Sequence, residues 1–349
     1  MVRILIVVAS IVATFMLLVA ICLNFIVTPE MLTPLVHKYA DKYLDADVKL
    51  KSVEATFFSS FPRFGLKIVD GVVVGHAFHQ QDSVATKADT LVVFEELRLG
   101  INLMRYLIDG ELSIGRARIR HPQVRLFKNE YGVCNWDIVK ESDTANADTT
   151  ESDMPITLRR ITIDNAQINY SDRTTKTNLY LADFNLFADG DMNLQTLDVD
   201  MRLSDRTTHL MVNNSQYIRG MSLGIDGHVE YDMESGKYVL KETNMDIDDS
   251  KLFMDGWLEP DSVGLDVNVR FGIETPRVED LFAQIPKEYI SAPIDVEGGF
   301  VSLSGTVVGA LTNSTYPVVN CKAEIDKVKA QYEGMDYPIE DLSALFTAC

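Results

Sequence analysis

The sequence is poor in cysteine, and its cysteines lie too far apart to form recognisable pairs. They are Cys22, Cys134, Cys321 and Cys349, and no CxxC occurs. Cys22 lies within an apolar run and Cys349 is the final residue, so a disulfide framework is not expected. The spacing of the thiols also fails to match that of zinc ligands. These features exclude a small disulfide-stabilised fold and a cysteine-based metal site.

Basic residues are scarce as well. The chain has 32 lysines and arginines against 51 aspartates and glutamates, which gives a net charge of −19. A surface of this charge repels phosphate groups, so nucleic acid is a poor partner. Peripheral docking on anionic lipid through a basic patch is disfavoured for the same reason.

Motifs for nucleotide binding and for zinc hydrolysis are absent: no GxGxxG, GxxxxGK[ST] or HExxH occurs. Gly220–Gly224 matches the GxSxG pattern of hydrolases. That pattern requires a strand, a sharp turn and a helix, but apolar alternation continues straight through it. In the acidic stretch 189–200, Leu194 stands at the position where a calcium loop requires glycine. We therefore predict that the protein is not an enzyme and has no catalytic residues, metal ligands or cofactor.

The single long hydrophobic run lies at the N-terminus. Ile4 to Val27 contains no charged residue, and a helix of this length crosses the roughly 30 Å hydrocarbon core of a bilayer. Arg3 favours a cytoplasmic N-terminus. A cleaved signal peptide and a lipoprotein site at Cys22 are the alternatives. The run is longer than a signal core, and Ile21 is too bulky for lipoprotein processing. Residues 1–27 are therefore predicted to be an uncleaved, single-pass anchor in a bacterial inner membrane, with the bulk of the chain in the periplasm.

A helix is predicted directly after this run. Thr28 and Pro29 are a capping hydroxyl and a proline suited to the first helical position. Apolar residues then recur at helical spacing: Leu32, Leu35, Val36, Tyr39 and Tyr43. The polar side is not rich in lysine, so we expect this apolar stripe to pack on a core rather than on a lipid surface.

From about Val48 the apolar period becomes two, which predicts antiparallel strands with one apolar and one wet face. The predicted fold class is mainly β: an anchor, then an elongated, twisted antiparallel sheet or groove with short helices at 101–108 and 276–282. Asp189-Gly190, Ser235-Gly236 and Asp255-Gly256 are predicted turns. The apolar residues of three clear runs are Leu197, Val199, Met201, Leu203, Met221, Leu223, Ile225, Leu265, Val267, Val269 and Phe271.

One stretch interrupts the strands. Residues 140–155 contain five acids and no large apolar residue except Met154, so they are predicted to be a solvated linker. The predicted domains are the anchor 1–27, a helix and β-region 28–139, the linker 140–155 and a second β-region 156–349. The last residues resemble the start of a further strand, so we expect the second region to be truncated.

Several short motifs occur in the order typical of one protein family. They are Phe61–Leu66, Val69–Val74, Ala88–Leu91, Leu107–Ile114, Pro122–Leu126 and Gly132–Trp136. Together with the anchor and the short helix, they resemble the N-terminal part of AsmA-family proteins. The resemblance implies a long β-sheet rolled into a groove, as in bridge-like lipid-transfer proteins. Membrane phospholipid is the implied partner, with outer-membrane assembly components as a second.

The leading hypothesis is an inner-membrane-anchored periplasmic protein that handles or bridges phospholipid toward the outer membrane. In this hypothesis the eleven apolar residues named above contact acyl chains in the groove. A non-enzymatic envelope-assembly factor that regulates protein targeting to the membrane, without carrying lipid, is the second hypothesis. A structural or adhesion β-protein is the third. An apolar face of this kind also suits a sandwich core against a second sheet, and the sequence leaves that alternative open.

Overall fold

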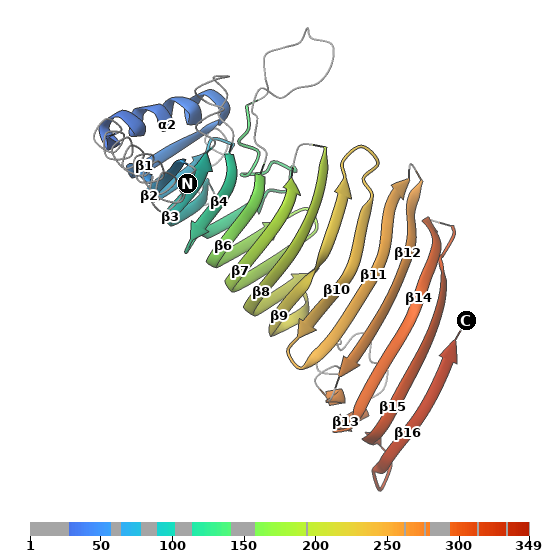
Figure 1. Cartoon of the computed structure of the whole chain (residues 1–349). Helices are drawn as coiled ribbons and strands as arrows, with labels where there is room; N and C mark the ends of the chain where they lie inside the picture. Colours follow the sequence, from blue (N-terminus) through green and yellow to red (C-terminus); the bar gives the residue numbers. More distant parts are fainter. Residues whose placement is uncertain are drawn as a thin grey trace, which may run out of the picture. The chain divides into compact units, whose positions relative to one another are not determined.

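The computed structural model describes residues 28–56, 64–77, 89–101, 114–140, 158–192, 195–261, 263–275, 277–279, 294–312, 314–332 and 334–348. These residues form one helix of 15 residues and 16 strands (Figure 1), which confirms the mainly β fold class. The predicted anchor 1–27 and all of the predicted linker except Lys140 lie outside the described residues. Within those residues, no helix has the length and apolar character needed to cross a membrane.

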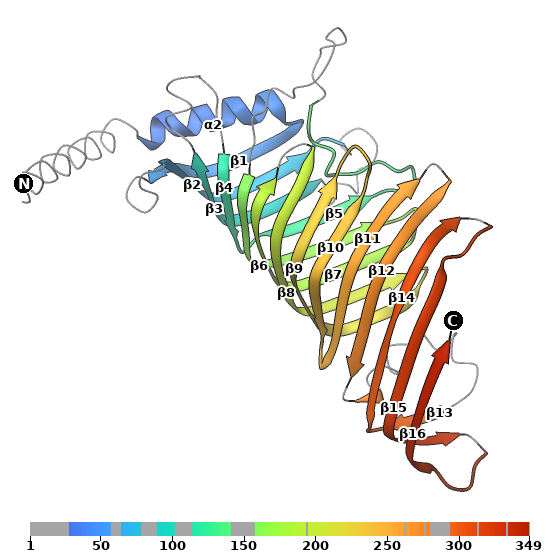
Figure 2. The same ribbon diagram turned by 45° about the vertical axis from the view of Figure 1, so that its right-hand side comes forward.

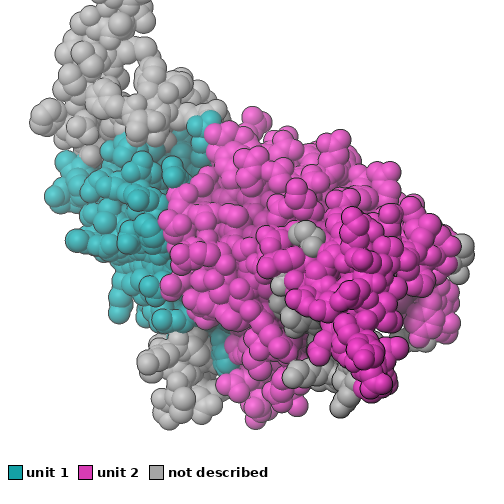
Figure 3. All heavy atoms as spheres, turned by 90° about the horizontal axis from the view of Figure 1, so that it is seen from below, with its two compact units in different colours: residues 1–127, 133–158 teal, residues 128–132, 159–349 magenta. Residues whose placement is uncertain are grey.

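The chain divides into two compact units (Figure 3), and each is described by itself. Unit 1 comprises residues 1–127 and 133–158, and unit 2 comprises residues 128–132 and 159–349.

Unit 1 is a small antiparallel sheet with a helix, α2 (Pro29–Tyr43), in contact with its first strand. Its sheet has the order β1-β2-β3-β4. β5 also pairs with β3, at Val92 and Val93, ahead of the residues of β3 that pair with β4. The strand bounds are β1 Ala46–Thr56, β2 Phe64–Gly75, β3 Thr90–Ile101, β4 Ile114–Arg120 and β5 Gln123–Lys128.

The helix starts where the sequence predicts, at Pro29, but its N-cap differs from the expected one. The Thr28 side chain makes no capping hydrogen bond, whereas its carbonyl accepts the N–H groups of Met31 and Leu32, both at 3.1 Å. Leu32 is buried in the core of unit 1, and Val36 packs against that core. Part of the apolar stripe therefore packs on protein, as predicted, whereas Leu35 of the same stripe is exposed. The other buried members of the core are Val53, Leu66, Ile68, Phe94 and Ile101.

Asn135 explains the closing motif of unit 1. Its side chain is fully buried, its Oδ1 accepts the Phe127 N–H at 2.9 Å, and its Nδ2 donates to the Arg125 carbonyl at 2.7 Å. The Asn135 side-chain amide thus makes the same kind of hydrogen bonds that a peptide group would make. These bonds close the loop against one end of β5. A buried amide in this position satisfies the Phe127 N–H and the Arg125 carbonyl of β5.

Asn135→Ala is expected to lower the free energy of unfolding of unit 1 by about 1–3 kcal/mol, because it removes two hydrogen bonds between a buried side chain and the backbone. Asn129→Ala is the matched control. Asn129 Oδ1 accepts the exposed N–H of Tyr131 at 2.9 Å. Chemical denaturation of both variants is the measurement. An equal loss in the two would show that the burial of the Asn135 amide has no energetic role.

Unit 2 is one layer of long strands in the order β6-β7-β8-β9-β10-β11-β12-β14-β15, with β13 and β16 also paired to β15. The strand pairs from β7 to β16 are antiparallel. The strands bend along their length (Figure 2), so the layer is curved. The bounds are β6 Leu158–Asp172, β7 Thr177–Met192, β8 Thr196–Val212, β9 Ser215–Asp232, β10 Tyr238–Ile247, β11 Ser250–Asp261, β12 Gly264–Thr275, β13 Ile294–Glu297, β14 Phe300–Thr312, β15 Val318–Tyr332 and β16 Ile339–Ala348.

Two of the three predicted turns are wrong. Ser235-Gly236 does lie in the turn between β9 and β10, but Asp189-Gly190 lies within β7 and Asp255-Gly256 lies within β11. Gly256 has φ +140°, and a Cβ there would stand 2.1 Å from the Asn268 carbonyl oxygen. The glycine allows β11 to approach β12 closely rather than to reverse direction.

The predicted short helices fall mostly outside the described residues. Of the first, only Ile101 is described, and it is the last residue of β3. Of the second, residues 277–279 are described, and Val278 and Glu279 are helical.

Candidate functional site

Strand register joins the apolar residues of unit 2 into continuous rows that cross the sheet. Residues directly opposite each other in antiparallel strands share a face, so a row of paired residues is also a row on one face. One row takes a single residue from each strand between β7 and β16 except β13: Leu186, Leu203, Ile225, Met245, Leu252, Ile273, Leu303, Ala323 and Phe346. No polar residue interrupts it.

A second row runs parallel to the first on the same face, because the two are an even number of residues apart on β8, β9 and β12. Its members are Gly190, Val199, Val229, Leu240, Gly256, Val269, Val307 and Val319. We call the face that carries these two rows the apolar strip, and the opposite face of the same strands the wet face.

The eleven residues predicted to contact acyl chains all lie on the face of the apolar strip, on β8, β9 and β12. Val199, Met221, Val267 and Val269 are buried, and the other seven are partly buried. Neighbouring side chains on the same curved sheet thus already shield them in part. The assignment of these residues to lipid contact remains a prediction.

Among the described residues, no second sheet or helix covers the apolar strip. Contacts between strands follow the hydrogen-bonded order, and the helix–strand contact is that of α2 with β1, in unit 1. The described residues thus supply no partner for the sandwich alternative. An open hollow of about 430 Å³ is lined by residues of β11, β12 and β14–β16, including Phe271. By strand register most of its lining side chains, among them Arg270, Ser304 and Lys322, lie on the wet face, so this hollow is not part of the apolar strip.

One carboxylate interrupts the apolar side of β8. Asp205 is buried opposite Leu223, at the start of a register shift between β8 and β9. Burial raises the pKa of Asp205, whereas hydrogen bonds from the Thr208 hydroxyl and from the N–H groups of Ala182 and Leu223 oppose that rise. Both oxygens of Asp205 accept from Thr208 Oγ1 at 2.9 Å. The carboxylate therefore accepts hydrogen bonds from β7, β8 and β9 at the point where the register of β8 and β9 shifts.

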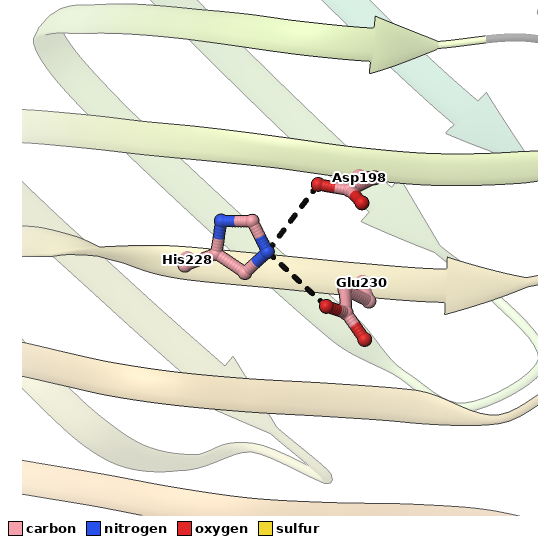
Figure 4. Close-up of side chains that lie close together, drawn as sticks. All are labelled: Asp198, His228 and Glu230. Carbon is pink, nitrogen blue, oxygen red and sulfur yellow. Dashed lines mark hydrogen bonds and ion pairs between the residues drawn. The ribbon is translucent and has the colours of Figure 1, made fainter.

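The wet face carries a group of charged side chains around His228 (Figure 4). Its Nε2 lies 3.3 Å from Asp198 Oδ1 and 3.3 Å from Glu230 Oε1, and its Nδ1 lies 3.1 Å from Asp200 Oδ1. Lys241 donates to Glu230. The side chains of His228 and Glu230 are partly buried, at 29% and 33% exposed.

The neighbouring carboxylates set the protonation of this group. The hydrogen bond with Asp200 is the main cause that raises the pKa of His228, and Glu230 and Asp198 act in the same direction against partial burial. The hydrogen bond from Lys241 is the main cause that lowers the pKa of Glu230. The group therefore holds an imidazole whose cationic form is favoured, next to a Glu230 carboxylate whose ionised form is favoured.

Sequence reasoning identified three strands of the apolar strip and missed the rest. On β11, Leu252, Met254 and Leu258 alternate clearly, so that strand carried a usable signal. From the sequence we predicted no metal ligands and did not identify the group around His228. His228 and Glu230 share a face by alternation, but Asp198 joins them only through the register of β8 with β9.

The fold and this surface define a class of protein: one whose unit 2 is a single-layer β-sheet with one largely apolar face and one largely polar face. Residues 1–193 match the AsmA family, which is more than half of the 349 residues. The chain therefore belongs to the AsmA family, as the motifs predicted. Comparisons with curated proteins and with solved structures gave no match.

Membership makes this an AsmA-like protein of the cell envelope, from a family that is generally non-enzymatic. The GxSxG match is not a nucleophile elbow, as predicted: Ser222 lies within β9, and its hydroxyl donates to Asp248 Oδ1 at 3.0 Å. The family match ends just after β7, so most of the apolar strip lies beyond it.

Proposed function

We propose that this chain is an inner-membrane-anchored periplasmic protein that holds the acyl chains of phospholipid on the apolar strip of unit 2. The observation that supports the proposal most strongly is the uninterrupted apolar row from β7 to β16, with no covering layer among the described residues. Exposing hydrocarbon to water costs about 0.8 kcal/mol per CH₂ group. When acyl chains bind to the apolar strip, the strip and the chains shield each other from water. The cost is then removed for both.

The size of the strip suits this ligand. Strands in a sheet are about 4.8 Å apart, so a row over nine strands extends for roughly 38 Å. One leaflet of a bilayer provides roughly 15 Å of hydrocarbon, half of the usual core thickness. The strip is thus long enough for more than one acyl chain end to end. The charge-free run Ile4–Val27 supports attachment to the inner membrane, from which such lipid would come.

Site-specific photocrosslinking in cells tests the proposal. A photoreactive amino acid at Leu265, on the face of the apolar strip, is expected to label phospholipid. The same amino acid at Asp266, the next residue and exposed on the wet face, is expected to give no lipid adduct. Labelling at neither position, or at both equally, would contradict the proposal. Adducts at Leu265 with a protein instead of lipid would favour the envelope-assembly factor.

A further inference from the structure

The group around His228 has the composition and spacing of a metal site. Asp198 lies on β8 directly opposite Glu230 on β9, and Asp200 lies opposite His228. One ligand atom from each of Asp198, His228 and Glu230 lies within 4.8 Å of the other two. Zinc bonds to nitrogen and oxygen are about 2.0–2.1 Å, which places neighbouring ligand atoms of a tetrahedral site about 3.3–3.4 Å apart. The two distances from His228 Nε2, both 3.3 Å, already match that separation.

Asp200 provides the second feature of such a site. Metal-binding histidines usually donate their other ring N–H to a carboxylate or a carbonyl, which fixes the ring and its tautomer. Asp200 Oδ1 lies 3.1 Å from Nδ1 of His228. When Nδ1–H donates to Asp200 and an ion displaces the proton of Nε2, the lone pair of Nε2 faces Asp198 and Glu230 (Figure 4). The imidazole is thus oriented toward the two carboxylates by a residue outside the ligand set.

We propose that Asp198, His228 and Glu230 bind one divalent transition-metal ion, with Asp200 as the positioning residue for His228. One imidazole and two carboxylates suit ions of the zinc type rather than calcium or magnesium, which prefer oxygen ligands alone. Three protein ligands leave further positions for water. The ion joins β8 to β9 on the wet face, opposite the apolar strip, so this site does not depend on whether the strip binds lipid.

Lys241 is the group that competes with the ion. It lies on β10 opposite His228, and its Nζ donates to the same Glu230 oxygen that lies near Nε2. Lysine carries its charge on a flexible stem and can withdraw toward solvent, where half of its side chain already lies. Its removal should therefore strengthen metal binding, whereas removal of a ligand should weaken it.

The test is titration of the full chain, purified in detergent and freed of metal, with Zn²⁺ by calorimetry and with Co²⁺ by visible absorption. We expect one Zn²⁺ per chain at this site and the absorption bands of Co²⁺ bound to protein. His228→Gln is expected to reduce the affinity more than tenfold, and Asp200→Asn about tenfold. Lys241→Met is expected to raise the affinity severalfold. Asp266→Asn, which removes an exposed carboxylate from the wet face of β12, is the matched control and should change nothing.

Thermal unfolding provides a second readout that does not rely on the affinity alone. Zn²⁺ should raise the melting temperature of the wild type and of Asp266→Asn, and not that of His228→Gln. Circular dichroism confirms that the variants are folded before titration. Failure of the wild type to bind Zn²⁺, or equal binding by the wild type and His228→Gln, overturns the proposal. So does weaker binding by Lys241→Met, because the lysine would then support the group instead of competing with the ion.

Discussion

Val53→Asp is expected to unfold unit 1. Val53 is 0% exposed, pairs with Ile68 on β2 and belongs to the core that includes Leu32 of α2. An aspartate in this place loses its water and gains no cation. An uncompensated buried charge costs about 3–5 kcal/mol, and a typical domain is stabilised by only about 5–15 kcal/mol. Unit 1 is small and is expected to lie at the low end of that range, where the substitution removes most of its stability.

Hydrogen exchange measures this effect within the full chain, because it reports unit 1 and unit 2 separately. The amides of β1 and β2 should lose their protection in Val53→Asp. Val139→Asp is the matched control: the substitution is the same and lies in the same unit, but Val139 is 64% exposed. It should leave protection nearly unchanged. If Val53→Asp retained the protection of the wild type, Val53 would not lie in a closed core.

The sequence predicted the parts of the fold that depend on local periodicity. Within the runs 197–203 of β8, 221–225 of β9 and 265–271 of β12 the apolar residues alternate without interruption, so both the strands and their apolar faces were predictable. The start of α2 at Pro29 was predictable too, because proline and the helical spacing from Leu32 to Tyr43 act locally. These elements are specified by residues close together in the chain.

A bulge hid β10. Its register shifts between Leu240 and Thr243, and Glu242 has φ +49°. The extra residue changes which residues face the apolar strip, from Leu240 before the bulge to Met245 after it. A fixed period of two therefore breaks within the strand. The sequence carries no clear sign of where such a shift falls.

The group around His228 could not be predicted from the sequence, because it depends on the register between β8 and β9. Asp198 and Glu230 are 32 positions apart in the sequence, and they meet because β8 and β9 form a long hairpin with three register shifts at its turn end. A change of one residue in that register would move every side chain of β9 to the other face. The alternation of His228 and Glu230 showed a shared face, but not which carboxylates of β8 lie across from it.

Val267→Asp is expected to reduce lipid binding at a moderate cost in stability. Val267 lies on the face of the apolar strip between Leu258 and Gly309, and it is 8% exposed. No layer among the described residues covers it, so an aspartate there keeps water on one side while no lipid is bound. We expect a cost of about 1–3 kcal/mol, less than for Val53→Asp. Bound acyl chains, in contrast, would have to contact the charge.

Asn268→Asp is the matched control. It places the same carboxylate one residue further along β12, on the exposed wet face. Neither variant alters the N-terminal run, so any lipid held around a membrane anchor is the same in both. A difference between the two variants therefore reports on the apolar strip alone.

The most direct measurement is lipid extraction and mass spectrometry of the purified full chain, paired with thermal unfolding, for the wild type and these two variants. We predict phospholipid on the wild type and on Asn268→Asp, and clearly less on Val267→Asp, which stays folded. A wild type without phospholipid, together with a Val267→Asp variant that collapses like one with a charge in a closed core, would contradict the lipid-binding strip.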